Sequence, residues 1–364
     1  MKYKLRIKQS LKNFNSYVPD EIDFLFRLNA NESPFDDTEN ILRNLYRKNN
    51  RRYLQSNSIN RYPDPIQKDL RKKVSSFHGV NQNQIVFGNG SDELILYLLL
   101  VLTGRTSKVM YLEPSFSMYK ILTAAVGLKG IKVELNKNFQ IDIANMISKI
   151  RKDDPDLIFI PTPNNPTGNS FDPDDIKKII KTSKGLVIID EAYADYSTQS
   201  YFPLLKKNEN LLIMRTMSKI GFASLRLGYL VGDKKIINEI NKIRLPYNIS
   251  TLSQVIASDY FVNQQSSKQK ITIIKKERIK LMDFLNKFSK VQTFESDSNF
   301  ILIRLKESKS LNNFLRKNNI IVRSFDSHKR LQNCLRLTVG LPSENKKLMS
   351  TFSKFIKKST KKKY

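Results

Sequence analysis

Cysteine, histidine and tryptophan are scarce in this 364-residue chain, which contains one cysteine, two histidines and no tryptophan. The single cysteine, Cys334, excludes an intrachain disulfide. With His78 and His328 as the only histidines, the sequence has no cysteine–histidine cluster at zinc-binding spacing. We therefore expect neither a structural disulfide nor a metal site.

Long hydrophobic runs are also missing. The longest, LILYLLLVL at residues 94–102, has about half the length that a membrane-spanning helix requires. The opening residues, MKYKLRIKQSLKNFNS, contain no apolar stretch of the kind that forms the centre of a secretory signal. We expect a cytoplasmic protein that does not enter a membrane.

Acidic residues are few relative to basic ones: 34 Asp and Glu against 63 Lys and Arg give a formal net charge of +29. Such a charge can indicate nucleic-acid binding when it forms a stripe or patch. Here the lysines are spread along the whole chain, as in INEINKIR and KNNRRY, and the dense run is the C-terminal KKSTKKKY. This spread indicates a biased composition rather than a binding surface, so we expect no nucleic-acid partner.

Between about residues 60 and 235, short apolar runs alternate with amphipathic helical patterns. The apolar runs include QIVFG, KVMYLEP, DLIFIPTP, GLVIIDEAY and LLIMRT, and the helical patterns include SDELILYLLLVL and PDDIKKIIKTS. Nearly continuous Ile, Val and Leu runs are typical of strands that are buried on both faces. The alternation therefore predicts an α/β fold with a mostly parallel sheet covered by helices.

The pattern changes after about residue 245. A long polar helical stretch at 250–289 precedes NFILIRL, NIIVRSF and CLRLTVG, whose alternation is typical of half-buried strands. The first 45 residues carry little regular patterning, and we expect them to lie against this second region. The sequence thus predicts a large cofactor-binding α/β domain at residues 45–245 and a small α+β domain formed by residues 1–44 and 246–364.

Glycine and polar residues follow the predicted strands, where open α/β sheets bind their ligands. After QIVFG comes GNGSDE, in which Gly88 and Gly90 precede a helix start whose N–H groups suit a phosphate. Taken alone, an ordinary capped glycine turn explains that pattern better. After DLIFIP comes TPNNPTG, where prolines and a glycine hold Asn165 rigidly; a plain tight turn does not explain the pair Asn164–Asn165.

Three charged residues complete this set. Asp190 follows the apolar run LVII and needs a cationic partner, which a structural ion pair or a ligand would supply equally well. Lys219 follows LLIMRT in a partly apolar setting, which favours the free amine needed for covalent chemistry with a carbonyl. Arg226 supplies a planar guanidinium that suits a phosphate.

These residues together match the needs of one cofactor. Pyridoxal 5′-phosphate requires a lysine for covalent attachment, a carboxylate for its pyridinium nitrogen and donors for its phosphate. From about Tyr17 to about Phe352 the chain resembles the fold-type-I pyridoxal-phosphate aminotransferases of class I and II, through GNGSDELI, PSFSMY, PNNPTG, DEAY and RTMSKIGFASLRLGY. The stretches LNANESP, RYPDP and CLRLTVG make it most similar to the histidinol-phosphate aminotransferase branch.

The resemblance implies roles for the cofactor-binding positions. Lys219 would bind the cofactor covalently and move a proton, and Asp190 would pair with the pyridine nitrogen. The phenolic oxygen would accept hydrogen bonds from Asn165 and Tyr193, and the ring would stack on Phe116. The cofactor phosphate would be held by the backbone N–H groups of Ser91 and Asp92, by Ser218 and Arg226 and, from the neighbouring subunit of a homodimer, by Tyr62.

The resemblance also implies the substrates. Arg336 would bind the carboxylate of glutamate or the phosphate of L-histidinol phosphate, in a pocket shaped by Arg323, Tyr17 and Asn165. The implied reaction transfers an amino group between L-histidinol phosphate and 2-oxoglutarate in histidine biosynthesis. Alternatives on the same scaffold are an aminotransferase for aromatic or other substrates and an enzyme resembling threonine-phosphate decarboxylase.

A non-catalytic basic binding protein with a retained aminotransferase fold is the alternative from another class, and the intact set of site residues argues against it. Two positions depart from the family pattern. Phe116 stands where tyrosine is more usual, and the spacing from Lys219 to Arg226 is one residue shorter than in many relatives.

Overall fold

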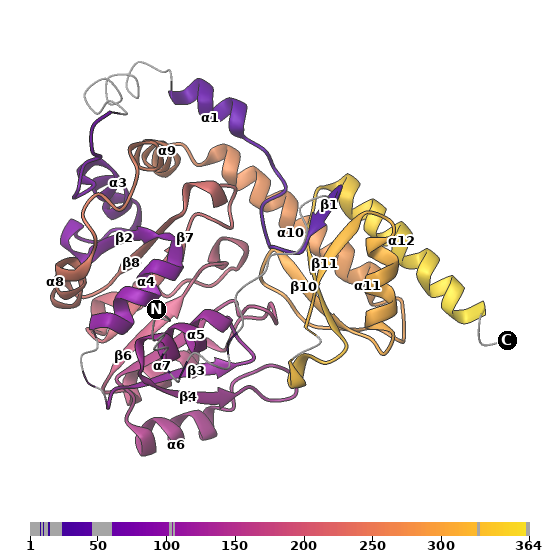
Figure 1. The fold of residues 1–364 in the computed structure, drawn as a ribbon, viewed down its shortest axis with the longest axis horizontal. Helices are drawn as coiled ribbons and strands as arrows, with labels where there is room; N and C mark the ends of the chain where they lie inside the picture. The colour runs from indigo at the N-terminus through magenta and orange to yellow at the C-terminus, as the bar shows by residue number, and fades with distance from the viewer. Residues whose placement is uncertain are drawn as a thin grey trace, which may run out of the picture.

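The structure, a computed structural model, describes residues 24–45, 60–101, 104, 106–325 and 328–361, together with residues 8, 10 and 14. Two sheets organise this part of the chain, one of seven strands and one of five. Figure 1 shows the larger sheet with its helices on the left and the smaller sheet on the right, joined by the long helix α10 (Gln265–Leu285).

The larger sheet has the strand order β2-β8-β7-β6-β5-β3-β4. Its strands are β2 (Ile85–Asn89), β3 (Lys108–Glu113), β4 (Lys129–Glu134), β5 (Leu157–Pro161), β6 (Leu186–Asp190), β7 (Leu211–Thr216) and β8 (Leu227–Val231). The pairs from β4 to β7 are parallel, whereas β8 is antiparallel to both of its neighbours. The predicted α/β class and the mostly parallel sheet are confirmed.

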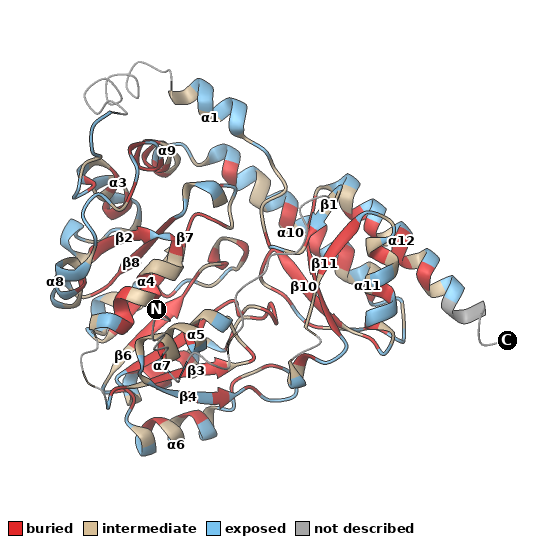
Figure 2. Ribbon diagram, viewed as in Figure 1, coloured by how far each residue is buried: buried red, intermediate tan, exposed pale blue. Residues whose placement is uncertain are grey.

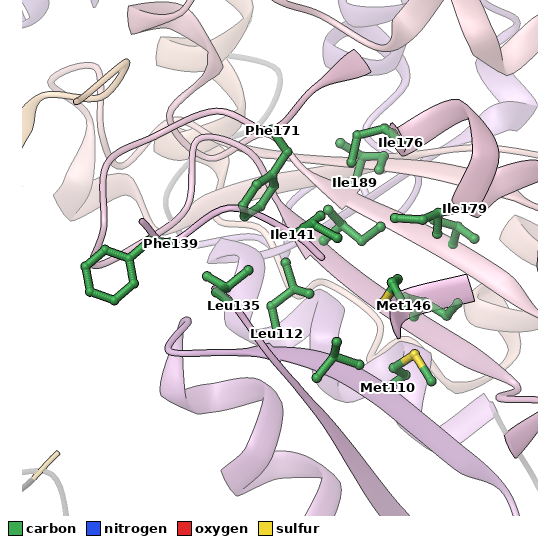
Figure 3. Close-up of a cluster of buried hydrophobic side chains, with 14 of the residues drawn as sticks. Met110, Leu112, Leu135, Phe139, Ile141, Met146, Phe171, Ile176, Ile179 and Ile189 are labelled. Carbon is green, nitrogen blue, oxygen red and sulfur yellow. The ribbon is translucent and has the colours of Figure 1, made fainter. Parts of the chain in front are cut away.

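Helices cover both faces of this sheet, which explains its apolar strands. Successive residues of β6 point to opposite faces: Val187 and Ile189 pack in one cluster and Ile188 in the other. The first cluster includes α6 (Ile143–Asp153) and α7 (Pro173–Thr182), as the close-up in Figure 3 shows. The second includes α4 (Gly90–Val101), α5 (Ser117–Val126) and α8 (Lys234–Ile243). Figure 2 shows the resulting buried layer between the helices.

The smaller sheet has the strand order β1-β11-β12-β10-β9. Its strands are β1 (Phe26–Leu28), β9 (Gln292–Thr293), β10 (Phe300–Arg304), β11 (Ile320–Ser324) and β12 (Cys334–Thr338), and its helices are α10, α11 (Ser308–Arg316) and α12 (Pro342–Lys361). The N-terminal strand β1 pairs in parallel with β11, so the two ends of the chain share this sheet (Figure 1).

Two strands of the smaller sheet, β10 and β12, differ from the half-buried pattern that the sequence predicts. All five residues of β12 are buried, as are four of the five in β10. One face, with Ile301 and Ile303, packs in the cluster that includes α10, α11 and α12. The other face, with Leu302 and Cys334, packs in the cluster of the larger sheet. The prediction was wrong because the larger domain covers the face that was expected to meet water.

The predicted helical stretch at 250–289 is two helices, α9 (Thr251–Val262) and α10, with Asn263 ending the first. Helix α9 packs with α3 (Lys68–His78) against the larger sheet, through Ala257 and Phe261. Helix α1 (Thr38–Leu45) lies beside α9. Helix α9 and all but the last residue of α1 fall in the ranges that the sequence assigns to the small domain, and the domain limits at 45 and 245 stay a prediction.

Short 3-10 helices connect these elements: η2 (Gln82–Gln84), η3 (Ala194–Tyr196), η4 (Phe202–Lys207), η5 (Ala223–Leu225) and η6 (Lys329–Leu331). In the part of the chain that the structure describes, no helix combines the length and apolar character needed to span a membrane.

Candidate active site

One cavity at the ends of the strands of the larger sheet collects most of the predicted site residues. It is lined by Ser91, Asp92, Phe116, Asn165, Asp190, Tyr193, Ser218, Lys219 and Arg226, together with Tyr119, Pro161, Pro163, Ala192 and Thr216. Parallel strands end at one edge of the sheet, so the residues after β5, β6 and β7 meet there. The topology therefore joins segments that lie far apart in the sequence.

Lys219 lies in the loop that follows β7. Its backbone is fixed by the Tyr196 hydroxyl, which donates a hydrogen bond of 2.6 Å to the Lys219 carbonyl. Its amine, Nζ, lies 3.4 Å from the carbonyl oxygen of Ala30 and 5.8 Å from the centre of the Tyr193 ring. The amine thus lies at the cavity, between the Ala30 carbonyl and the Tyr193 ring.

Asp190 is the last residue of β6 and is 5% exposed. Its carboxylate accepts a hydrogen bond of 2.5 Å from the Tyr119 hydroxyl and one of 3.0 Å from the backbone N–H of Ala192. Burial raises the pKa of Asp190 to about 6, although these two hydrogen bonds favour the ionised form. Burial and the neighbouring Asp190 raise the pKa of the Tyr119 hydroxyl well above its usual value, so it stays a donor.

The turn between β2 and α4 meets Arg226, and both line the cavity. One guanidinium nitrogen, Nη2, lies 3.1 Å from Oδ2 of Asp92, and Nη1 lies 3.4 Å from the Ser218 hydroxyl. Arg226 has a φ of +48°, which redirects the chain directly after η5. This left-handed residue shows how the short spacing after Lys219 still brings the guanidinium to the cavity.

Two glycines permit this close packing. A Cβ atom on Gly90, whose φ is +76°, would lie 2.7 Å from Nη2 of Arg226. A Cβ atom on Gly228 in β8 would lie 2.8 Å from the backbone nitrogen of Ser91. The turn is therefore pressed against β8, with the first N–H groups of α4 at the cavity.

Asn165 and Arg336 are joined by a direct contact across the two domains. Nη1 of Arg336 donates a hydrogen bond of 2.6 Å to Oδ1 of Asn165, and Nη2 donates one of 2.6 Å to the carbonyl of Asn29. Arg323 of β11 is the register partner of Arg336 in β12, so the two arginines are neighbours in the smaller sheet. This arrangement places two cations of the small domain together and links one to the cavity.

The remaining predicted residues lie elsewhere. Tyr62 is 78% exposed and stacks on Tyr247, with the ring centres 4.5 Å apart, outside the cavity. Tyr17 lies outside the described residues. No cluster of three or more metal-ligating side chains occurs within the described ranges.

Sequence reasoning missed two polar residues that contact the site. Tyr119 follows Phe116 by about one helical turn, and this spacing could have placed both side chains on one face of a helix. Asn31, in LNANESP, donates a hydrogen bond of 3.0 Å to the Tyr193 hydroxyl. No periodic or strand-end signal marks Asn31, because its contact depends on how the two domains meet.

The side chains that line the cavity fit pyridoxal phosphate. A buried carboxylate, Asp190, lines the cavity and suits a pyridine nitrogen, and the Arg226 guanidinium with the start of α4 suits the phosphate. Lys219 supplies the amine, and Phe116 supplies an aromatic face. The missing Cβ atoms of Gly90 and Gly228 let the Arg226 guanidinium and β8 pack directly against the start of α4.

This fold and this set of residues define a fold-type-I enzyme that uses pyridoxal phosphate. The chain belongs to the family of class I and II aminotransferases, which it matches over residues 25–352. The predicted family and cofactor are thereby confirmed.

Within that family, the chain is similar to several histidinol-phosphate aminotransferases. The protein from Aquifex aeolicus is 37% identical over 96% of this chain and 98% of its own length. The one from Thermoanaerobacter pseudethanolicus is 34% identical over 94% of this chain and 97% of its own. Among solved structures, histidinol-phosphate aminotransferase from Clostridium acetobutylicum is 26% identical, covers 90% of this chain and 98% of its own, and has a TM-score of 0.81.

Proposed function

We propose that the protein transfers an amino group between L-histidinol phosphate and 2-oxoglutarate, using pyridoxal phosphate, in histidine biosynthesis. The products in one direction are imidazole acetol phosphate and L-glutamate. The observation that carries this proposal is the cavity in which an amine, a buried carboxylate and a guanidinium converge. Relatives of nearly the same length that carry the name histidinol-phosphate aminotransferase support the choice of substrate.

When bound, pyridoxal phosphate supplies an aldehyde and an electron-withdrawing ring. Lys219 would hold the cofactor, and its Nζ would carry the proton removed from the α carbon of the amino donor. Asp190 would keep the ring nitrogen protonated, because a buried carboxylate stabilises a cation at hydrogen-bonding distance. Phe116 would orient the ring by stacking, and Asn165 and Tyr193 would hydrogen-bond its phenolic oxygen.

The two phosphate-bearing molecules would be bound at different ends of the site. Ser91, Asp92, Ser218 and Arg226 would hold the cofactor phosphate at the start of α4, where backbone N–H groups attract an anion. Arg336, with Arg323 beside it and Tyr17 near the pocket, would hold the phosphate or carboxylate of the substrate. The contact between Arg336 and Asn165 would then join substrate binding to the cofactor's phenolic oxygen.

We also propose that the enzyme is a cytoplasmic homodimer in which Tyr62 reaches the cofactor phosphate of the neighbouring subunit. Tyr62 and Tyr247 form an exposed aromatic pair, and Leu245 and Ile66 are 62% and 48% exposed. Apolar side chains on such a surface favour contact with a partner. A second copy of the chain is the partner that would give Tyr62 a role in the site.

The test compares amino donors with one purified enzyme and 2-oxoglutarate. We expect kcat/KM for L-histidinol phosphate to exceed that for phenylalanine and tyrosine by at least about tenfold, because the arginines select a phosphate. Equal or better rates with the aromatic amino acids would contradict the proposal. Release of carbon dioxide from threonine phosphate, without consumption of 2-oxoglutarate, would favour the decarboxylase alternative instead.

A further inference from the structure

Three consecutive residues after β1 contact three predicted site residues from both domains. The Asn29 carbonyl accepts a hydrogen bond from Arg336, and the Ala30 carbonyl lies 3.4 Å from the Lys219 amine. The Asn31 amide contacts the Tyr193 hydroxyl. This segment therefore lies beside the cavity, next to Lys219 and Tyr193, and the Asn31 side chain contacts Tyr193.

Asn31 is held rigidly. It is 1% exposed, and its φ of +54° is one that asparagine and aspartate tolerate better than most residues. Its backbone N–H donates to the Thr338 hydroxyl at 3.1 Å, and its carbonyl accepts from the Asn299 amide at 3.0 Å. Its backbone is thus fixed by the last residue of β12 and by the residue that precedes β10.

The hydrogen bonds around Thr338 determine which way the Asn31 amide points. The Asn31 backbone N–H can only donate, so the Thr338 hydroxyl accepts it and has one proton of its own to give. Among the described residues, the acceptor recorded for that proton is Oδ1 of Asn31, at 3.1 Å. Thr338 is 2% exposed, and the reversed amide would leave its buried proton unpaired. The amide nitrogen of Asn31 therefore faces Tyr193.

We propose that Asn31 is a positioning residue that directs the hydroxyl proton of Tyr193 into the cavity. The Asn31 N–H occupies an acceptor position on Tyr193 Oη, so the tyrosine cannot donate back to it. Tyr193 then has its own O–H left to donate to an acceptor in the cavity. On the proposed function, that acceptor is the phenolic oxygen of pyridoxal phosphate, whose ionised form a donor stabilises.

Several titratable or charged groups surround Tyr193 and share its environment. The Lys219 amine lies 5.8 Å from the ring centre. Tyr119 of α5 and Tyr196 of η3 interact electrostatically with it. The rings of Tyr193 and Phe300 meet edge to face, with their centres 5.1 Å apart. The Arg336 guanidinium lies 5.2 Å from the centre of the Phe300 ring. A charge added at Asn31 would act on these groups as well, so the test includes a background that lacks the Tyr193 hydroxyl.

The variant Asn31→Asp tests this role. Aspartate keeps the size and tolerates the positive φ, but its carboxylate accepts hydrogen bonds and would take the Tyr193 proton away from the cavity. In the holoenzyme without substrate, we expect the pH midpoint of the cofactor's absorbance change to rise by about one unit, the size of a lost hydrogen bond to an ionised group. The dissociation constant for pyridoxal phosphate should also increase.

Two further variants separate this role from a general loss of structure. In a Tyr193→Phe background, Asn31→Asp should leave the midpoint where Tyr193→Phe alone puts it, since the hydroxyl is gone. Asn210→Asp is the matched control. Asn210 directly precedes β7, at the end of that strand far from Lys219, and its amide donates to the backbone carbonyls of Ile180 and Ser183. It should leave the midpoint unchanged.

Thr338→Val covers the case in which Asn31→Asp does not fold. It removes the hydroxyl that orients the amide, so the midpoint should shift in the same direction by a smaller amount. A wild-type midpoint in Asn31→Asp, or in Thr338→Val if that variant alone folds, would overturn the role of Asn31. A wild-type protein that shows no cofactor absorbance would overturn the proposed function itself.

Discussion

At the scale of single residues, Asp190 is a buried carboxylate, and the proposed function requires its negative charge. Its raised pKa, about 6, means that the folded chain binds a proton there more tightly than the unfolded chain does. The stability contributed by that proton is present below about pH 4 and is lost as the pH rises through about 6. The chain thus accepts a buried carboxylate that destabilises it at neutral pH.

Asp190→Asn should separate these two effects. The unliganded variant should be more stable than the wild type by up to ~3 kcal/mol at pH 7.5, and no more stable at pH 4. Its transamination rate should fall by several orders of magnitude, because the electrostatic partner of the ring nitrogen is lost. Denaturant titrations at both pH values and rate measurements check this; a mildly reduced rate would mean that Asp190 is structural.

Tyr119→Phe should weaken the same site through Asp190. The ring keeps its stacking on Phe159, but the hydrogen bond that favours the Asp190 carboxylate is lost, so the Asp190 pKa rises further. Binding of pyridoxal phosphate should weaken about tenfold at pH 6.5 and less at pH 8.5, where the carboxylate stays ionised. Tyr201→Phe, a buried tyrosine whose hydroxyl contacts Gln199, is the control. An equal loss at both pH values would contradict the role of Tyr119.

The sequence predicted the charged site residues better than the ones that support them. Lys219, Asp190 and Arg226 stand out because a charge directly after an apolar strand, or in the loop beyond it, is unusual. In the sequence Tyr119 resembles an ordinary core residue of α5. Its hydrogen bond to Asp190 depends on the packing of α5 beside the end of β6, which the sequence does not give. The assigned roles of these residues remain predictions, whereas their convergence in one cavity is a property of the fold.

At the scale of elements, the turn from β2 to α4 depends on its close contact with β8. The strands themselves were predictable, since runs such as LLIMRT and LVIID bury both faces. The contact between Gly228 and the Gly90–Ser91 backbone was not predictable, because more than a hundred residues of sequence separate β2 from β8. The burial of β10 and β12 on both faces was missed because it also depends on contacts between segments far apart in the sequence.

Gly228→Ala should displace this turn. The added Cβ would lie within 2.9 Å of backbone atoms of Gly90 and Ser91, which cannot move aside as a side chain can. We expect a loss of about 1–3 kcal/mol in the free energy of unfolding and at least tenfold weaker binding of pyridoxal phosphate. Gly130→Ala is the control, because its Cβ would meet the movable end of Tyr111. Unchanged cofactor binding in Gly228→Ala would contradict a role for the turn.

At the scale of the whole molecule, the homodimer proposal makes each site depend on two subunits. Tyr62→Ala and Lys219→Ala should each be inactive or nearly so, because one removes the shared phosphate contact and the other the reactive amine. Mixed dimers formed by co-expression should recover up to about a quarter of wild-type activity, since half of the dimers would carry one complete site. Activity assays on the mixture check this, and no recovery would contradict the shared site.

The central claim is that one lysine among the many in this chain, Lys219, carries the chemistry. Reducing the holoenzyme with borohydride and mapping the cofactor-bearing peptide by mass spectrometry tests it directly. We expect the label on Lys219, and neither label nor transamination in Lys219→Ala. A label on another lysine, or near-normal turnover in Lys219→Ala, would contradict the account.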